Sequence, residues 1–504
     1  MIELTNLAKI VTNRRLANLP LLGVAKGKGK GRNREEELLH LLTTETNLTS
    51  LQAAKMLYGS TSAQSRAAVR KLKQRLQEKL LNHLYFLDYS DPRHPVFRRY
   101  EQQCLDLLQQ ARVLWWESER SLLPQLLRKT LRLAQDGDFT QHVVSTLDLM
   151  RNLYVESNDF AKYRATVRLS ERYQEVLEKE REALHLFWGA KMDLMRSVQA
   201  RRRLLQYLPE VIGKLEESSR ATRSYVIYDA LLKLQLMHQE LLGNFEEIIT
   251  ITAEAEDLYA KGKLNRKRFD SRFTKFYSLY AHLRARRLDE GLALGENYMK
   301  AFSRSTGNWF SMLENYFLLA MHSGEYVKAG ELLKRMQQNP FVTRLTRPAV
   351  QRWELMRAYL YFVRPEEAGR RTLQFAQLVQ SIPDHSRDKR GYNVAILILQ
   401  FLHYLRQGHD EALLARLEGL RKYETAYLRD ASTLRSRLLF RLLQLTVKQN
   451  FDPVAVEEKG QALFERLRDA PPPGEAYSEI EIIPYENLWR LTLGILRQRK
   501  AEAR

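Results

Sequence analysis

The densest run of side chains that could bind a charged ligand lies between residues 261 and 287, KGKLNRKRFDSRFTKFYSLYAHLRARR. Ten Lys and Arg accompany a single acid, Asp270, in this run. Arg268, Arg272 and Lys275 are spaced so that they share one stripe of a helix. Such a stripe of cations attracts phosphates and carboxylates. We therefore select these three residues as candidates for steering an acidic partner.

A second stripe of the same run is aromatic. Phe269, Phe273, Phe276 and Tyr280 recur at helical spacing. Aromatic rings interleaved with cations can hold single-stranded nucleic acid, because bases stack on the rings while phosphates pair with the cations. The same spacing is typical of the buried face of an amphipathic helix, and this core interpretation is the favoured one.

Another basic stretch lies near the N-terminus, TSLQAAKMLYGSTSAQSRAAVRKLKQRL (49–76). Arg66, Arg70 and Lys73 stand at i, i+4 and i+7 of a helix. The stretch resembles the helix-turn-helix of bacterial regulators, which implies that these cations face DNA. The turn between Leu57 and Val69 is expected to be about four residues too long for the usual motif. The alternative is a helical cap whose basic face is solvated. The inner faces of the two helices would be apolar: Ala53, Ala54 and Leu57, then Val69 and Leu72.

No catalytic or metal-binding constellation is visible in the sequence. The 11 histidines form no metal-binding pair at helical spacing, and no nucleophile elbow is present. GKGKG (27–31) lacks the preceding strand and the Ser or Thr of a phosphate-binding loop, and is better explained as a flexible basic tether. Cys104, the single cysteine, lies on an apolar helical face and is expected in the core. We expect a non-enzymatic protein without cofactor or metal.

Composition predicts a helical protein. The 504 residues include only 22 Gly and 14 Pro, too few breakers for a turn-rich β protein. The longest apolar stretch, residues 394–402, is about half of a bilayer span. With one cysteine and no signal-like segment, we expect a soluble cytoplasmic protein. The net charge of +21 favours acidic partners: nucleic acid, anionic lipid or an acidic protein face.

One phrase recurs along the chain: a small residue, a gap, an aromatic, two further residues and a mostly apolar residue. It appears as GDFTQH (137–142), NDFAKY (158–163), GNFEEI (243–248) and GEYVKA (324–329). We expect the small residue to end one helix and the aromatic to begin the next, packing against the previous helix.

Weaker copies of the phrase extend the series. We call the residue at the aromatic position of each copy its anchor. Successive anchors are 43, 38, 39 and 44 residues apart, and this variable period near 40 indicates a solenoid of helix pairs. Between Phe139 and Phe160 the interval is only 21, so the pattern slips there. The anchors are Phe245, Leu288, Tyr326, Pro365 and His409.

Residues 310–343 carry the best single unit, FSMLENYFLLAMHSGEYVKAGELLKRMQQNPFVT, with Pro340 near its end. This unit resembles the tetratricopeptide repeat (TPR), although Tyr316-Phe317 replaces the family's Leu-Gly pair. The resemblance covers residues 220–440 and, more loosely, 120–220. It implies stacked antiparallel helices in a right-handed α-solenoid, with a concave surface of the kind that binds peptides or helices. The matching positions are Leu313, Phe317, Ala320, Gly324, Tyr326 and Ala329.

The sequence divides into four predicted parts. Residues 1–33 form an N-terminal helix and a Lys/Gly tether, and residues 34–90 a helical module that resembles the helix-turn-helix. The TPR-like solenoid follows over 91–470. Residues 471–504 form an extended strap, with the strand-like run EIEIIP, and a final helix.

Two functions are consistent with this organisation. The leading one is a non-enzymatic scaffold that binds an acidic protein or peptide segment in a basic solenoid groove. The other is a nucleic-acid-binding regulator whose N-terminal module contacts DNA and whose solenoid senses a partner. Oligomeric state cannot be deduced from the sequence.

Overall fold

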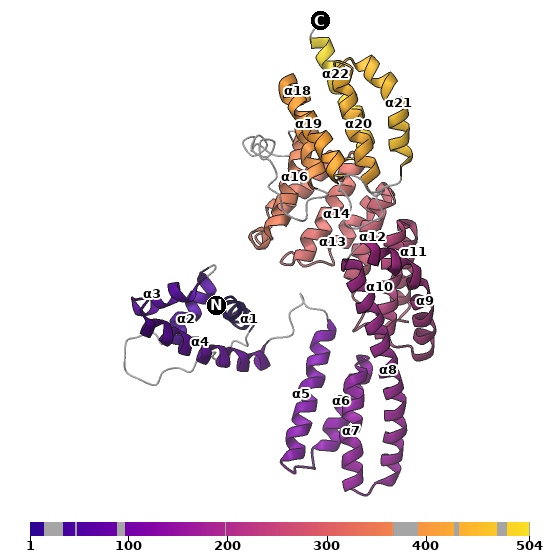
Figure 1. Ribbon diagram of the computed structural model, residues 1–504. Helices are drawn as coiled ribbons and strands as arrows, with labels where there is room; N and C mark the ends of the chain where they lie inside the picture. Colours follow the sequence, from indigo (N-terminus) through magenta and orange to yellow (C-terminus); the bar gives the residue numbers. More distant parts are fainter. Residues whose placement is uncertain are drawn as a thin grey trace. The chain divides into compact units, whose positions relative to one another are not determined.

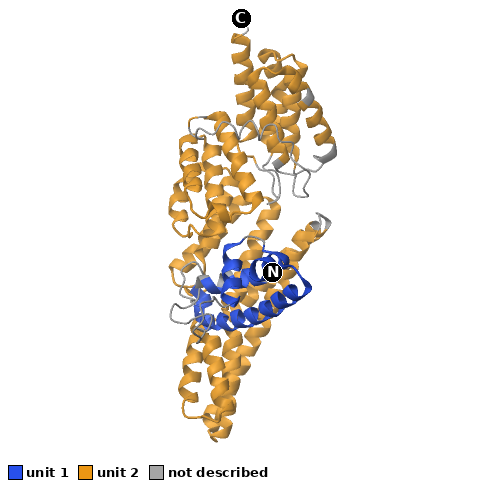
Figure 2. Cartoon of the chain, turned by 90° about the vertical axis from the view of Figure 1, so that its left-hand side faces the viewer, with its two compact units in different colours: residues 1–102 blue, residues 103–504 orange. Residues whose placement is uncertain are grey.

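The computed structural model is all-α, as predicted from the sequence, and its described residues hold no β-strand. The chain divides into two compact units, residues 1–102 and 103–504, blue and orange in Figure 2. The predicted tether lies largely outside the described residues. These are 1–14, 34–45, 48–87, 96–196, 198–364, 366, 392–427, 433–470 and 481–502.

Unit 1 is a small helical module around one apolar core, which includes Leu38, Leu57 and Leu76. A capping box opens α3: the Thr49 side chain accepts a hydrogen bond from the Gln52 backbone, and the Gln52 side chain accepts one from the Thr49 backbone. Thr49 is therefore the N-cap of α3. The helices of this unit are α1 (Ile2–Arg14), α2 (Arg34–Thr44), α3 (Ser50–Tyr58) and α4 (Ala63–His83), with the 3-10 helix η1 (Leu84–Phe86) after α4.

The connection between α3 and α4 is short. Gly59 ends α3 with a left-handed φ of 73°. Tyr58 is the last residue of α3 and Ala63 the first of α4, which leaves four residues, 59–62, between them. A turn of three or four residues is what a helix-turn-helix has. The excess length inferred from the Leu57–Val69 spacing was wrong, because α4 begins well before Val69.

Unit 2 is a succession of helices, most of them labelled in Figure 1. The boundary between the units falls within α5 (Val96–Trp116). The first part continues with α6 (Leu123–Asp136), α7 (Thr140–Glu156), α8 (Phe160–Arg196), α9 (Val198–Thr222), α10 (Tyr225–Leu242), α11 (Phe245–Ala260) and α12 (Ser271–Arg284). Then follow α13 (Leu288–Met299), α14 (Gly307–Ser323), α15 (Tyr326–Gln337), η2 (Val342–Arg344), α16 (Arg347–Val363), α18 (Tyr392–Gln407), α19 (Asp410–Tyr427), α20 (Leu434–Lys448), α21 (Pro453–Asp469) and α22 (Tyr485–Glu502).

From α6 to α16, each helix packs against the next one along the chain. In addition α8 packs against α10, and α12 against α14. Each helix therefore buries apolar side chains against its neighbours along the chain, which is compatible with a helical repeat fold. Cys104 is buried in α5, as expected. The best repeat unit folds as the hairpin α14–α15, and Leu313, Phe317, Ala320 and Ala329 are fully buried in it.

Two of the recurring phrases behave at their turns as predicted. Gly243 and Gly324 end α10 and α14 with φ values of 73° and 77°. After α18 the left-handed residue is Gly408, with a φ of 71°, directly before the anchor His409 and not two places before it as the pattern requires. Only glycine adopts this left-handed conformation without a steric cost. Phe245 is buried at the start of α11, as the packing of the anchor requires. Pro365 lies outside the described residues.

The phrase fails at other positions. Phe160 begins α8 but is 72% exposed, so it does not pack against the preceding helix as predicted. His409 is exposed as well, although its ring stands edge-on to Tyr404 of α18, with ring centroids 6.5 Å apart. In GDFTQH, Gly137 ends α6 and Phe139 is buried at the start of α7, as expected, but the left-handed residue is Asp138, with a φ of 50°. Helices α8 and α9 have 37 and 25 residues, which is longer than any helix from α10 to α16. The slipped interval between Phe139 and Phe160 thus precedes a long irregular hairpin.

A buried polar cluster connects distant parts of this irregular region. Glu180 in the middle of α8 accepts hydrogen bonds from Thr140 Oγ1 (2.7 Å) and Ser224 Oγ (2.6 Å). Asn265 Nδ2 donates to Asp138 Oδ2 at 2.7 Å. Burial raises the pKa of both carboxyls against the effect of these hydrogen bonds. We call this set of five residues the Glu180 cluster.

The C-terminal part is held by a second buried cluster, centred on Arg435 of α20. Its guanidinium binds both carboxylate oxygens of Glu481 (2.6 and 3.0 Å) and Oε2 of Glu486 (2.9 Å). It also donates to the carbonyls of Leu467 and Ala470 at 2.8 and 3.0 Å. Residues 481–484, the described end of the predicted strand-like run, form no strand. The helix predicted after them is α22.

Candidate functional site

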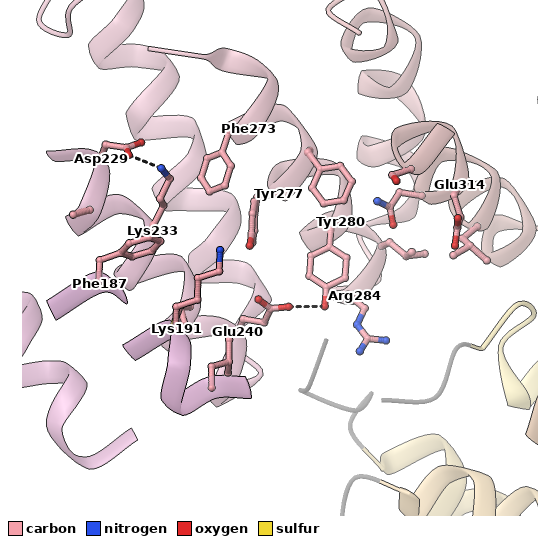
Figure 3. Close-up of a pocket in the computed structure, with 18 of the residues that line it drawn as sticks. Phe187, Lys191, Asp229, Lys233, Glu240, Phe273, Tyr277, Tyr280, Arg284 and Glu314 are labelled. Carbon is pink, nitrogen blue, oxygen red and sulfur yellow. Dashed lines mark hydrogen bonds and ion pairs between the residues drawn. The ribbon is translucent and has the colours of Figure 1, made fainter. Parts of the chain in front are cut away.

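Unit 2 contains a cavity of about 810 Å³ lined by alternate helices of the array. The lining side chains come from α8, α10, α12, α14 and α16, together with Arg286 and Glu481. Helices α9, α11, α13 and α15 lie between these along the chain. One helix of each successive pair thus faces the same hollow, which we call the groove (Figure 3).

Aromatic rings of α12 form one wall of the groove. Phe273, Phe276, Tyr277 and Tyr280 are all half-buried and line it. The Phe273 and Tyr277 ring centroids are 4.8 Å apart, and Tyr280 stands edge-on to Tyr277 at 6.5 Å. The predicted aromatic stripe therefore divides: Phe269 is buried, whereas the other three members line the groove.

The opposite wall comes from α8 and α10. Lys233 of α10 forms an ion pair with Asp229 one turn before it. Its ammonium lies 5.7 Å from the ring centroids of both Phe187 and Phe273, close enough for cation–π attraction. Lys191 of α8 lies 5.0 Å from the ring centroid of Trp188. Figure 3 shows both lysines beside the aromatic rings.

Half-buried carboxylates of α10 and α14 also line the groove. Tyr280 donates a hydrogen bond to Glu240 at 3.1 Å, and Arg352 binds Glu314 at 3.0 and 3.2 Å. Burial raises the pKa of both glutamates, although Arg284 and Arg352 oppose the shift. Because burial removes water from these carboxylates, an ion pair formed beside them is strengthened.

One end of the groove is formed by the segment before α22. His322 Nε2 lies 2.5 Å from the Glu481 carbonyl oxygen, which accepts the hydrogen bond. Arg286, just after α12, binds Glu486 at 2.9 Å. Burial lowers the pKa of His322. The cluster around Arg435 thus positions one end of the groove as well as α22.

The three predicted steering residues do not line the groove. Arg272 forms two hydrogen bonds with Asp270, at 2.7 and 2.6 Å. Lys275 Nζ donates to Ser271 Oγ at 3.3 Å. Both side chains are therefore engaged within or next to their own helix.

Arg268 lies beside the Glu180 cluster. Its guanidinium lies over the rings of Phe139 (5.2 Å) and Tyr225 (5.5 Å), and its charge acts on Asp138 and Glu180. It is thus surrounded by its own chain. Its role in steering a partner stays a prediction.

Sequence reasoning missed most groove residues. It named three rings of α12 but gave no role to Trp188, Lys191 or Lys233. These three residues belong to α8 and α10, far from α12 in sequence, and they come close to its rings only because the helices stack. The balance of charge was also not visible: the lining holds five cations, Lys191, Lys233, Arg284, Arg286 and Arg352, and four acids, Asp229, Glu240, Glu314 and Glu481.

In unit 1, the second candidate set lies on the outer face of α4. Arg66 and Arg70 are exposed and Lys73 is half-buried. Among the described residues no carboxylate pairs with any of the three, whereas Glu35 pairs with Lys79 farther along the helix. The inner-face residues are buried as predicted: Ala53, Ala54, Leu57, Val69 and Leu72.

Comparison with known proteins gives no match: no family model matches the chain, and no curated protein or solved structure is significantly similar to it. The part of the chain that the structure describes has no group of three metal-binding side chains. In the same ranges, no helix combines the length and apolar character needed to cross a bilayer.

Proposed function

We propose that this protein is a non-enzymatic scaffold that binds a segment of a partner protein in the groove of a right-handed, TPR-like solenoid. The observation that carries the proposal is the lining: alternate helices from α8 to α16 face one hollow of about 810 Å³. Peptide-binding solenoids use such a surface, because each repeat adds one helix to it.

The aromatic wall supports this function. Phe273 and Tyr277 are only half-buried, although rings of this size gain free energy from full burial. A bound segment would complete their burial, and aromatic side chains are frequent anchors of protein interfaces. Lys191 would attract an acidic partner to the same wall, in line with the net charge of +21.

Photo-cross-linking tests the proposal. A benzophenone amino acid replaces Tyr277 in the groove or, as a control, Val327, which is 61% exposed on α15. We expect irradiated cells to give discrete partner adducts with the Tyr277 variant that disappear when Phe273→Ala is added. Adducts that form equally at Val327, or none at Tyr277, would refute binding in the groove.

A second function is supported by unit 1. The four-residue turn between α3 and α4, and the cations on α4 that pair with no described carboxylate, support binding of duplex DNA by α4. If α4 makes three phosphate contacts, raising the salt concentration from about 50 to 200 mM should lower the affinity for DNA by about 40-fold. Replacing Arg66, Arg70 and Lys73 with Ala should remove this salt dependence. Replacing Lys79, which pairs with Glu35, should change it much less.

A further inference from the structure

The groove continues onto an exposed apolar stripe of α8. Leu184 and Trp188 line the groove, and Met192 and Met195 follow them along the same face at helical spacing. Their exposed fractions are 39%, 55%, 68% and 68%. An apolar stripe that water reaches and that borders a cavity is a mark of an interaction site. We call these four residues the α8 rim.

The chemistry of the α8 rim restricts the conformation of what binds there. An extended segment would bring backbone N–H and C=O groups against Leu, Trp and Met side chains, which offer almost no hydrogen-bond partners. Each backbone group buried without a partner is costly. A helix satisfies its own backbone groups and presents only side chains. The rim therefore favours a helical occupant.

The dimensions of the rim agree with a helical occupant. From residue 184 to residue 195 the helix rises by about 16 Å, or three turns. Rows of side chains four residues apart on one helix fit the spaces between such rows on another. Methionine adapts its shape to the side chains it meets. Met192 and Met195 can therefore pack against the apolar face of a second helix.

The charged side chains beside the rim indicate that the bound segment is negatively charged. Lys191 and Arg196 flank Met192 and Met195, and both are exposed. Neither forms an ion pair with a carboxylate of the described residues. The neighbouring Asp193 accepts a hydrogen bond from the Tyr207 hydroxyl at 2.8 Å. Acidic side chains along the polar edge of the occupant would pair with the two cations.

We infer that the partner segment is an acidic amphipathic helix of at least three turns, whose apolar face packs on the α8 rim and continues into the groove. This inference rests on the proposed binding function of the groove and specifies the class of ligand.

Selection from a phage-displayed library of random 16-residue peptides against the full chain tests the inference. We expect the selected sequences to carry apolar residues at i, i+4 and i+7 or i+8, and to be negatively charged. Synthetic copies should gain helical circular dichroism on binding. Insertion of a central proline should abolish binding, because proline interrupts a helix.

Variants of the rim locate the site. Trp188→Ala and Met192→Ala should each weaken binding of a selected peptide by at least about tenfold. Lys191→Glu should weaken it as well, whereas Lys191→Arg should preserve it. Met56→Ala, which changes a methionine of unit 1 that is 54% exposed, should have no effect. Circular dichroism of each variant would show that it is folded.

Two outcomes separate this inference from the proposed function. Selected peptides that lack helical spacing, tolerate proline and depend on Tyr277 but not on Trp188 would overturn the helical ligand and leave binding in the groove intact. Selected peptides that depend on neither Tyr277 nor Trp188 would overturn both. Basic peptides that bind at the rim would overturn the inferred charge.

Discussion

Arg435 gives the sharpest prediction about stability. Its guanidinium donates five hydrogen bonds, and it is 2% exposed. Arg435→Ala would leave Glu481 and Glu486, 9% and 8% exposed, as buried carboxylates without this cation. Removing one partner of a buried ion pair costs about 3–5 kcal/mol. We expect α22 to lose this amount of its opening free energy.

Hydrogen exchange measured by mass spectrometry is the suitable assay, because it reports opening of α22 by itself. A loss of about 3–5 kcal/mol corresponds to exchange that is roughly 100 to 5,000 times faster in residues 485–502. The control is Arg441→Ala, which removes an ion pair of 3.1 Å from an arginine that is 51% exposed. An exposed pair contributes about 0–1 kcal/mol.

The pH dependence adds a second check. Burial acts to raise the pKa of Glu486, but the hydrogen bond and charge of Arg435 outweigh it and hold the pKa below the ordinary 4.5. A lowered pKa stabilises the fold above pH 4.5, and this stabilisation is lost as pH falls through the folded value. The difference in the opening free energy of α22 between Arg435→Ala and the wild type should therefore become smaller in acid. Exchange in α22 no faster in Arg435→Ala than in Arg441→Ala would refute the reasoning.

Further substitutions test other parts of the fold. Gly295→Ala would place a Cβ 2.3 Å from a buried tyrosine ring of α14, so urea unfolding should show a loss of about 1–3 kcal/mol. Burial raises the pKa of Glu180, so ionisation of this carboxyl destabilises the wild type as pH rises. Glu180→Gln does not ionise, so its melting temperature should rise relative to that of the wild type between pH 4 and pH 7. Phe139→Ala should cost about 3–5 kcal/mol. Phe160→Ala, at an exposed position of the same phrase, should change stability by less than about 0.5 kcal/mol in the same assay.

The sequence predicted the parts of the fold that local patterns determine. The helix ends at Gly243 and Gly324 depend on residues a few positions apart, and they were confirmed. The exposure of Phe160 was not predictable, because it depends on how far the preceding helices reach beside α8.

The groove was predicted only as a consequence of stacking. The aromatic residues of α12 were visible as a stripe, but whether Phe273 faces a core or a cavity depends on helices that are distant in sequence. Arg268 was selected for its charge and lies instead over Phe139, which is far earlier in the chain, in a contact that no local pattern shows. Charge density by itself therefore did not distinguish a cation that supports the fold from one that is available to a ligand.

The Glu180 cluster bears on how this chain could have evolved. In an array where each repeat contacts only its neighbours, a helix pair can be duplicated or lost with little harm. Here Asn265 is hydrogen-bonded to Asp138, which lies 127 positions earlier in the chain. Adding or deleting a helix pair between these residues would separate them. We therefore expect lineages to vary the number of hairpins after α12 and to keep the stretch from α7 to α12 at constant length.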